Sequence, residues 1–191
     1  MINWIETMDF AILNGIQEFL RNDLLDLFFP FITALGNGGI FWIILGIGML
    51  FFSKSRRYGI VLLAVLAVGA LLGEGFLKPL IGRVRPCNVN QEISMLIARP
   101  HSFSFPSGHS WASFASAVVL WKADRRVGIA AFILAALIAF SRMYLYVHFP
   151  TDVLVGSLCG AATGWLGIQV MNMWMKRRKD IPAQKKNKGT P

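Results

Sequence analysis

The sequence predicts an all-α integral membrane protein, folded as a bundle of about six transmembrane helices. Of its 191 residues, 55% are hydrophobic and only 15% are charged, whereas soluble domains carry about 25% charged residues. Apolar runs alternate with short breaks that hold charge, glycine or proline. With loops this short, the length accommodates about six spans of roughly 20 residues each and leaves no room for a second soluble domain.

Five apolar runs are clear, and basic residues follow each of them: 40–52, 58–77, 111–121, 127–140 and 153–175. The GNGG sequence at 36–39 predicts a turn before the first run. Residues 24–35 are short for a span and include Asp26 and Pro30, but they would complete the count of six. Residues 1–22 mix acids with apolar residues, which is the pattern of an amphipathic helix in the membrane interface.

We expect a single membrane-embedded domain over residues 1–175 and a basic tail over 176–191. The net charge is +9, and seven basic residues and one acid lie between Lys176 and Lys188. Because the tail directly follows an apolar helix, it is expected to be a cytoplasmic segment near anionic lipid rather than a nucleic-acid-binding segment.

The basic breaks predict how the chain is placed in the membrane. If the five runs alternate, the breaks at 54–57 and 122–126 fall on the same side as the tail, and the positive-inside rule makes that side cytoplasmic. The segments 78–110 and 141–152 then share the outer face of a multi-pass plasma (inner) membrane protein. Six tryptophans, most of them near run ends, are expected to anchor the chain at the interface: Trp4, Trp42, Trp111, Trp121, Trp165 and Trp174.

Three polar clusters lie in these two outer segments. They are Lys78-x6-Arg85-Pro86, Pro106-Ser107-Gly108-His109 and Ser141-Arg142-x5-His148-x3-Asp152. The cations suit an anionic ligand, and the planar fork of arginine fits phosphate oxygens. Pro106 is suited to the first turn of a helix, so the N–H groups of Ser107, Gly108 and His109 would point at the outer pocket and form an anion site. The clusters therefore predict a phosphate site.

Phosphoryl transfer needs a nucleophile, a proton for the leaving oxygen and neutralisation of charge in the transition state. His148 is followed four residues later by Asp152, whose carboxylate would fix the imidazole tautomer and make the other ring nitrogen a better nucleophile. His109 is the better candidate for the acid that protonates the leaving group. No cluster of acids is available to hold a metal, so we expect metal-independent activity without a cofactor.

Glu74 stands one helical turn before Lys78. The simplest interpretation is an internal partner for a lysine near lipid. The alternative is that Glu74 shapes the choice of head group.

The three clusters together resemble the signature of the type 2 phosphatidic acid phosphatase superfamily, which includes membrane lipid phosphatases, glucose-6-phosphatase and vanadium haloperoxidases. The matching strings are KPLIGRVRP, PSGH and SRMYLYVHFPTD. The resemblance implies a six-helix bundle with a phosphatase/haloperoxidase-like core. It implies that His148 forms a phosphohistidine, that Asp152 activates it, and that His109 acts as acid and then as base. The residues it implies as phosphate ligands are Lys78, Arg85, Ser107, Gly108 and Arg142. Arg83 and Arg99 lie outside the pattern and are expected to guide anionic head groups.

The expected substrate is a lipid phosphate or diphosphate, which would be hydrolysed at the outer leaflet. Likeness to bacterial members favours the conversion of undecaprenyl diphosphate to undecaprenyl phosphate, with a phosphatidylglycerophosphate or phosphatidate phosphatase as the alternative. The sequence leaves two other readings open. One is a lipid phosphotransferase that uses the same site, and the other is an anion channel or transporter lined by Lys78 and the arginines. The expected partners are the substrate and membrane lipids, and the sequence does not predict an oligomeric state.

Overall fold

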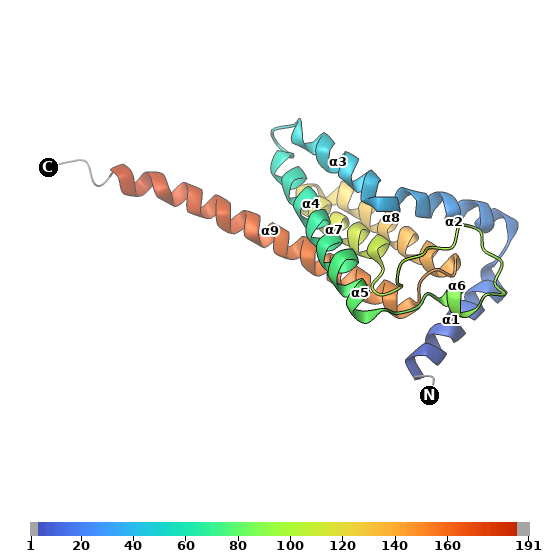
Figure 1. Cartoon of the computed structure of the whole chain (residues 1–191). Helices are drawn as coiled ribbons and strands as arrows, with labels where there is room; N and C mark the ends of the chain where they lie inside the picture. Colours follow the sequence, from blue (N-terminus) through green and yellow to red (C-terminus); the bar gives the residue numbers. More distant parts are fainter. Residues whose placement is uncertain (1–3, 187–191) are drawn as a thin grey trace.

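The computed structural model describes residues 4–186, with side chains described as far as residue 178, and over that range it contains helices and no strand. The elements in order are α1 (Trp4–Leu20), α2 (Asp23–Leu35), a 3-10 turn η1 (Asn37–Gly39), α3 (Ile40–Leu50), α4 (Arg56–Gly69), a π-helical segment η2 (Ala70–Leu77), α5 (Lys78–Ile81), α6 (Pro86–Val89), α7 (Gly108–Ala123), α8 (Arg125–Tyr144) and α9 (Pro150–Lys186). Figure 1 shows α3, α4, α7, α8 and α9 in one bundle, with α1, α2 and α6 toward the end that lies opposite the C-terminus. The all-α class is confirmed.

Helix α7 occupies the centre of the bundle, where it packs against α4, α8 and α9. It ends at Asp124, whose carboxylate also caps the start of α8 by accepting hydrogen bonds from the N–H groups of Arg126 (2.8 Å) and Val127 (3.1 Å). A Cβ atom at Gly128 would lie within 3.0 Å of the Trp121 backbone, so only glycine lets α8 return this closely along α7. This tight turn brings the first residues of α7 and the last residues of α8 to the same end of the bundle.

A stripe of glycines on α9 sets its distance from α7. Gly156, Gly160 and Gly164 recur every four residues, so they share one face of the helix. A Cβ atom at any of them would lie within 3.0 Å of the α7 backbone or the residue that caps it: Ser107 O, Trp111 O and Ala115 O respectively. Small residues at this spacing allow two helices in a membrane to touch backbone to backbone. The stripe therefore places the start of α9 beside the start of α7.

Fewer than six of the described helices are long and apolar enough to cross a membrane. Among the described residues, three helical stretches have the length and hydropathy of a span: Arg56–Val89, Arg125–Tyr144 and Pro150–Arg178. The pair α2 and η1–α3, bent by 41°, adds at most one more. By this measure, residues 24–35 count toward a crossing only together with residues 37–50. Helix α7 has 16 residues, or about 24 Å at 1.5 Å per residue, which is less than a hydrocarbon core of about 30 Å. The count of six is not confirmed.

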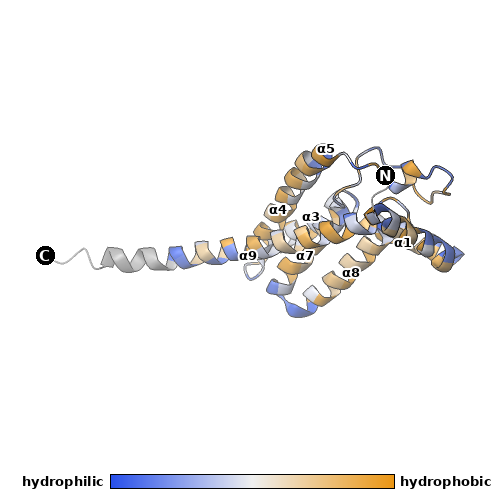
Figure 2. Cartoon of the chain, turned by 90° about the horizontal axis from the view of Figure 1, so that it is seen from below, coloured by the Kyte–Doolittle hydropathy of each residue, from blue (hydrophilic) through white to orange (hydrophobic). Residues whose placement is uncertain are grey.

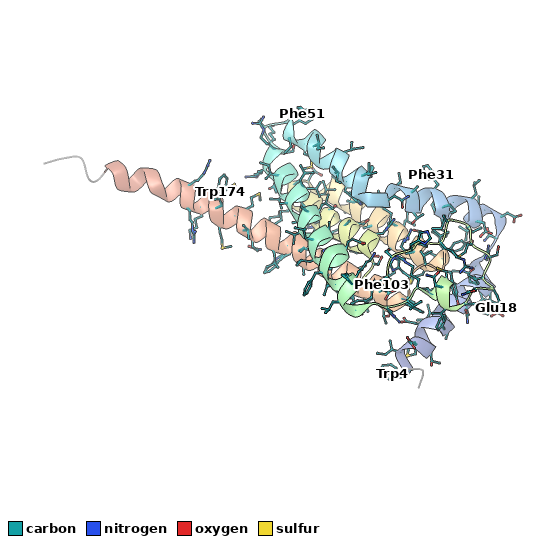
Figure 3. All side chains as sticks on the ribbon, viewed as in Figure 1. Trp4, Glu18, Phe31, Phe51, Phe103 and Trp174 are labelled. Atoms are coloured by element: carbon teal, nitrogen blue, oxygen red, sulfur yellow. The ribbon has the colours of Figure 1, made fainter. Side chains whose placement is uncertain are left out.

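Polarity varies along the bundle in the way a membrane protein requires. Figure 2 shows hydrophobic colour along α3, α4, α7 and α8, and hydrophilic colour at the turn between α7 and α8 and beyond the apolar part of α9. The side chains of Phe31, Phe51 and Trp174 point away from the bundle (Figure 3), and each is more than half exposed. Helix α9 continues past residue 175 to Lys186. Residues 187–191 of the expected tail lie outside the described residues.

Two tryptophans expected at the interface lie in the core instead. Trp42 is 1% exposed and donates its indole N–H to Ser113 Oγ at 3.1 Å. Trp111 is 5% exposed and donates to Thr163 Oγ1 at 2.8 Å. An indole N–H can be buried at little cost when it has such a partner. The expectation of an interfacial position rested only on the nearness of each tryptophan to the end of an apolar run, which gives no information about its hydrogen-bond partner.

Replacing Gly160 by alanine should destabilise the protein, because the new methyl group would push α9 away from the α7 backbone. We expect a loss of about 1–3 kcal/mol, measured as a lower midpoint of thermal unfolding in detergent. Gly48→Ala in α3 is the matched control. No atom lies within 4 Å of its Cβ position, so better helix propensity should leave stability unchanged or slightly higher. Equal midpoints for the two variants would contradict the close contact between α7 and α9.

Candidate active site

The three polar clusters meet at one end of the bundle. Lys78 follows η2, Arg85 precedes α6, Arg142 is in the last turn of α8, and His148 lies in the short loop before α9. The positive charges of Lys78, Arg85 and Arg142 act on His109 at the start of α7, and His148 lies beside Arg85. Apart from the half-buried His109 and Gly108, the residues predicted for the site are at most 5% exposed. The structure therefore brings together all eight predicted site residues, which come from separate parts of the chain.

The start of α7 differs in detail from the prediction. Pro106 precedes the helix, and Ser107 is its N-cap, with Oγ accepting from Ser110 N at 3.4 Å and from Ser110 Oγ at 2.9 Å. The N–H of Ser107 is not free, because it donates to the backbone oxygen of Asp152 at 3.1 Å. The first two N–H groups within the helix, those of Gly108 and His109, have no carbonyl four residues back in the helix to bind. These two, rather than three, are available to an anion.

The geometry around His148 distinguishes its two ring nitrogens. Nε2 lies 3.1 Å from Nη1 of Arg85, and since a guanidinium can only donate, Nε2 carries the lone pair. The proton is thus assigned to Nδ1, which faces Oδ2 of Asp152 at 3.5 Å. That distance exceeds a normal N–H···O hydrogen bond, and Nδ1 has no closer partner among the described residues. His148 and Asp152 are therefore adjacent and correctly oriented, but not tightly bonded.

The surroundings of His148 favour the neutral imidazole. The side chain is almost wholly buried, and burial lowers its pKa well below the ordinary value of 6.5. The positive charges of Arg85, Arg142 and Lys78 lower the pKa further. At neutral pH the ring is therefore uncharged, which is the form whose nitrogen lone pair can attack phosphorus.

Asp152 is held by several donors besides His148. Its Oδ2 accepts hydrogen bonds from Ser104 Oγ and from the N–H of Phe149, the latter at 2.9 Å. Its Oδ1 accepts from Nη1 of Arg83 at 2.7 Å. A fully buried carboxylate needs such donors to offset its desolvation, and together they fix its orientation.

The two arginines of the clusters are bound differently. Arg85 is anchored by the backbone oxygens of Ser102 (2.7 Å) and Val147 (2.8 Å), and by Ser102 Oγ (2.9 Å). Arg142 donates from Nη1 to Thr33 Oγ1 on α2 at 2.6 Å, whereas its buried Nε has no partner within the described residues. An unpaired buried donor is costly, and here it belongs to a guanidinium beside His109 and His148.

His109 is held against the turn between α2 and α3. Its Nε2 lies 2.9 Å from Oδ1 of Asn37. A Cβ atom at Gly36 would lie within 3.0 Å of the His109 ring, so glycine is needed at this position for the ring to pack there. The GNGG turn predicted from sequence thus forms, and it also positions the expected acid.

Glu74 reaches the start of α7. Both of its carboxylate oxygens lie 2.8 Å from Nζ of Lys78, so the expected i,i+4 partner is present. A Cβ atom at Gly108 would lie within 3.0 Å of Glu74 Oε1. The carboxylate, half exposed at 50%, therefore lies between a buried cation and the first N–H groups of a helix, which is where an anion is favoured.

Sequence reasoning missed several residues that orient the site: Asp9, Thr33, Asn37, Ser102 and Ser104. Each is a single polar residue far in sequence from its partner, and no spacing pattern marks it. The role in guiding head groups that was expected for Arg83 and Arg99 stays a prediction, although both guanidinium groups already bind within the protein. Arg83 binds Asp9 and Asp152, and Arg99 donates to the backbone oxygens of Cys87, Gln91 and Ile93 within its own loop.

A family model described as the PAP2 superfamily matches residues 57–176, which include all three clusters. The chain belongs to the PAP2 superfamily. It is 32% identical over 161 residues to an undecaprenyl-diphosphatase from Sulfolobus acidocaldarius, a match that covers 84% of this chain and 71% of the relative. The crystal structure of a transmembrane PAP2 type phosphatidylglycerolphosphate phosphatase from Bacillus subtilis superposes with a TM-score of 0.76 at 32% identity, over 90% of this chain and 88% of that one.

Membership of the PAP2 superfamily confirms two expectations. The relatives are named phosphatases, so this chain is an enzyme of that kind rather than a channel. A bacterial vanadium-dependent iodoperoxidase, 18% identical, shares the fold with a TM-score of 0.66 over 87% of this chain and 48% of its own. The expected phosphatase/haloperoxidase-like core is therefore present.

Glu74→Gln should strengthen the binding of inorganic phosphate, because an uncharged amide competes less well for Lys78 and the start of α7. We expect an affinity about 10-fold higher, equivalent to about 1.4 kcal/mol, measured from the rise in unfolding temperature with phosphate concentration. Glu92→Gln, in the exposed part of the loop between α6 and α7, controls for loss of charge. Weaker phosphate binding in Glu74→Gln would show that Glu74 only holds Lys78 in place.

Proposed function

We propose that this protein is a membrane lipid phosphatase that hydrolyses undecaprenyl diphosphate to undecaprenyl phosphate and phosphate at the outer leaflet, through a phosphohistidine on His148. The observation that carries this proposal is the arrangement of His148. It is buried and neutral, Nδ1 faces Asp152, and Nε2 lies among cations. A lone structural histidine would not need this surrounding charge, whereas a nucleophile for an anionic phosphorus centre does.

In the first step, the lone pair of His148 Nε2 attacks the terminal phosphorus as the bond to the bridging oxygen breaks. Arg85 Nη1, now 3.1 Å from Nε2, exchanges this contact for a phosphate oxygen. Asp152 stabilises the positive charge that develops on the ring by accepting from Nδ1–H. The negative charge of the bound substrate offsets the nearby cations and favours the protonated form of His109. That imidazolium donates its proton to the bridging oxygen, so the leaving group departs as the lipid monophosphate.

In the second step, water attacks the phosphohistidine. His109, now without its proton, takes one from the water, and the bond between phosphorus and Nε2 breaks to regenerate His148. Asn37, 2.9 Å from His109 Nε2, keeps the ring in place through both transfers. Inorganic phosphate is the second product.

Lys78, Arg85 and Arg142 supply the positive charge that neutralises the phosphate oxygens, together with the N–H groups of Gly108 and His109. The unpaired Nε of Arg142 gains an acceptor when the substrate binds. Because these cations do the work that Mg²⁺ or Zn²⁺ performs in other phosphatases, we propose that the reaction is independent of metal.

The site accommodates more than one lipid phosphate, because every ligand it offers is directed to the phosphate itself. Relatives named for undecaprenyl diphosphate and for phosphatidylglycerolphosphate both match most of this chain. A phosphatidylglycerophosphate or phosphatidate phosphatase is therefore the alternative. Transfer to a lipid hydroxyl instead of water would use the same phosphohistidine, and label recovered in lipid rather than in free phosphate would identify it.

Purified protein in detergent with a chelator should release phosphate from undecaprenyl diphosphate faster than from phosphatidylglycerophosphate or phosphatidate. His148→Ala should lower kcat by about a thousandfold or more, because the nucleophile is removed. His101→Ala is the matched control, since His101 is exposed on the loop before α7, and it should retain full activity. No release from any lipid phosphate by the wild type would refute the hydrolase.

The outward-facing site can be tested by labelling cysteines in intact cells, after both native cysteines are replaced. A cysteine at the exposed Glu92, in the loop beside the site, should react with an impermeant reagent. A cysteine at the exposed Lys54, in the turn between α3 and α4, should react only after lysis. The opposite pattern would place the reaction at the cytoplasmic leaflet.

A further inference from the structure

A carboxylate on the N-terminal helix is buried beside the site. Asp9 of α1 is 2% exposed, and its carboxylate accepts three hydrogen bonds from residues outside α1. They come from Arg83 Nη2 (2.7 Å), Thr151 N (3.0 Å) and Thr151 Oγ1 (2.6 Å). Thr151 is in the first turn of α9, directly before Asp152. The carboxylate thus ties α1 to the residue next to the proposed activator of His148.

Arg83 is shared between two buried carboxylates. Its Nη1 binds Asp152 Oδ1 and its Nη2 binds Asp9 Oδ2, both at 2.7 Å. The guanidinium lies over the ring of Phe149, 4.0 Å from its centroid. The planar fork of arginine holds two such partners in a fixed direction, so the position of Asp9 determines the direction from which Arg83 reaches Asp152.

Asp152 uses one oxygen for Arg83 and turns the other toward His148. We propose that Asp9 is a positioning residue for catalysis, acting through Arg83 to orient Asp152 and hence the His148 ring, and that α1 is part of the catalytic unit. The inference rests on the proposed function of His148. Helix α1 lies outside the family match, which begins at residue 57.

A purely structural role would not require this arrangement. Asp9 binds Thr151 through two hydrogen bonds, and these alone connect α1 to α9. The bond to Arg83 is not needed for that connection, but it gives the guanidinium that binds Asp152 a second carboxylate partner. Without the negative charge of Asp9, Arg83 would act on Asp152 alone, and Asp152 would stabilise a positive His148 ring less well.

Asp9→Asn tests the proposal because the amide keeps the shape and an acceptor oxygen but loses the charge. With the lipid phosphate that the wild type hydrolyses best, kcat should fall about 10-fold, and KM should stay the same because no phosphate ligand is altered. The acid limb of the kcat profile should move to lower pH, since removing a negative charge makes His148 harder to protonate. The charged and titratable groups facing His148 are unchanged in this variant: Lys78 after η2, Arg85 before α6, His109 on α7, Arg142 on α8 and Asp152 on α9.

A double-mutant cycle determines whether Asp9 acts through Arg83. Arg83→Gln alone should also lower kcat, and Asp9→Asn should have no further effect in that background, because the link is already broken. Effects that multiply would show that Asp9 does not act through Arg83, and would overturn the proposal.

Glu18→Gln is the matched control, because Glu18 is an exposed acid on the same helix and its side chain lies at the edge of the molecule (Figure 3). It should leave kcat, KM and the pH profile unchanged. Unfolding midpoints of all variants should be compared with that of the wild type. If the Asp9→Asn variant is as active as the wild type, the positioning role of Asp9 is overturned but the proposed phosphatase activity is not. If the wild type itself releases no phosphate, the proposed function is refuted.

Discussion

The direct backbone contact between α7 and α9 is the constraint on which the rest of this structure depends. The glycine stripe at Gly156, Gly160 and Gly164 removes the side chains that would hold the helices apart, and the N–H of Ser107 then reaches the backbone oxygen of Asp152 at 3.1 Å. Inside a membrane, helices gain little from hydrophobic association, so close packing and such hydrogen bonds hold them together. One consequence is that the start of α7, which offers N–H groups to an anion, lies beside Asp152 and His148.

The same end of the bundle must accommodate many charges next to an apolar interior. The acids and bases there are arranged as shared pairs: Lys78 with Glu74, and Arg83 with both Asp9 and Asp152. Pairing offsets the cost of burying each charge. Arg85 instead binds neutral oxygens, and Arg142 has one buried donor without a partner in the part of the chain that the structure describes. Arg85 and Arg142, which the proposed mechanism assigns to phosphate, therefore have no carboxylate partner among the described residues. Lys78, the third such cation, is paired with the half-exposed Glu74.

Much of the site could be predicted because its chemistry is concentrated in three short strings. Lys78, Arg85, His109, Arg142, His148 and Asp152 all lie at one end of the bundle, as the alternation of apolar runs indicated. The count of spans could not be predicted equally well, since hydropathy does not show that residues 24–35 and 40–50 form one bent pair, or that α7 has only 16 residues. Trp42 and Trp111 were misplaced for a related reason: their hydrogen-bond partners, Ser113 and Thr163, are distant in sequence.

By itself, the sequence determined the class of fold, the family and the polar groups that meet at one end of the bundle, because apolar runs, basic breaks and compact motifs are local properties of the chain. Only the tertiary structure decided how those groups are oriented. Asn37 against His109, Thr33 against Arg142, and Asp9 against Arg83 are contacts between residues 72, 109 and 74 positions apart. A single polar residue carries no periodic signal, and its partner is chosen by the packing of helices that the glycines and turns allow.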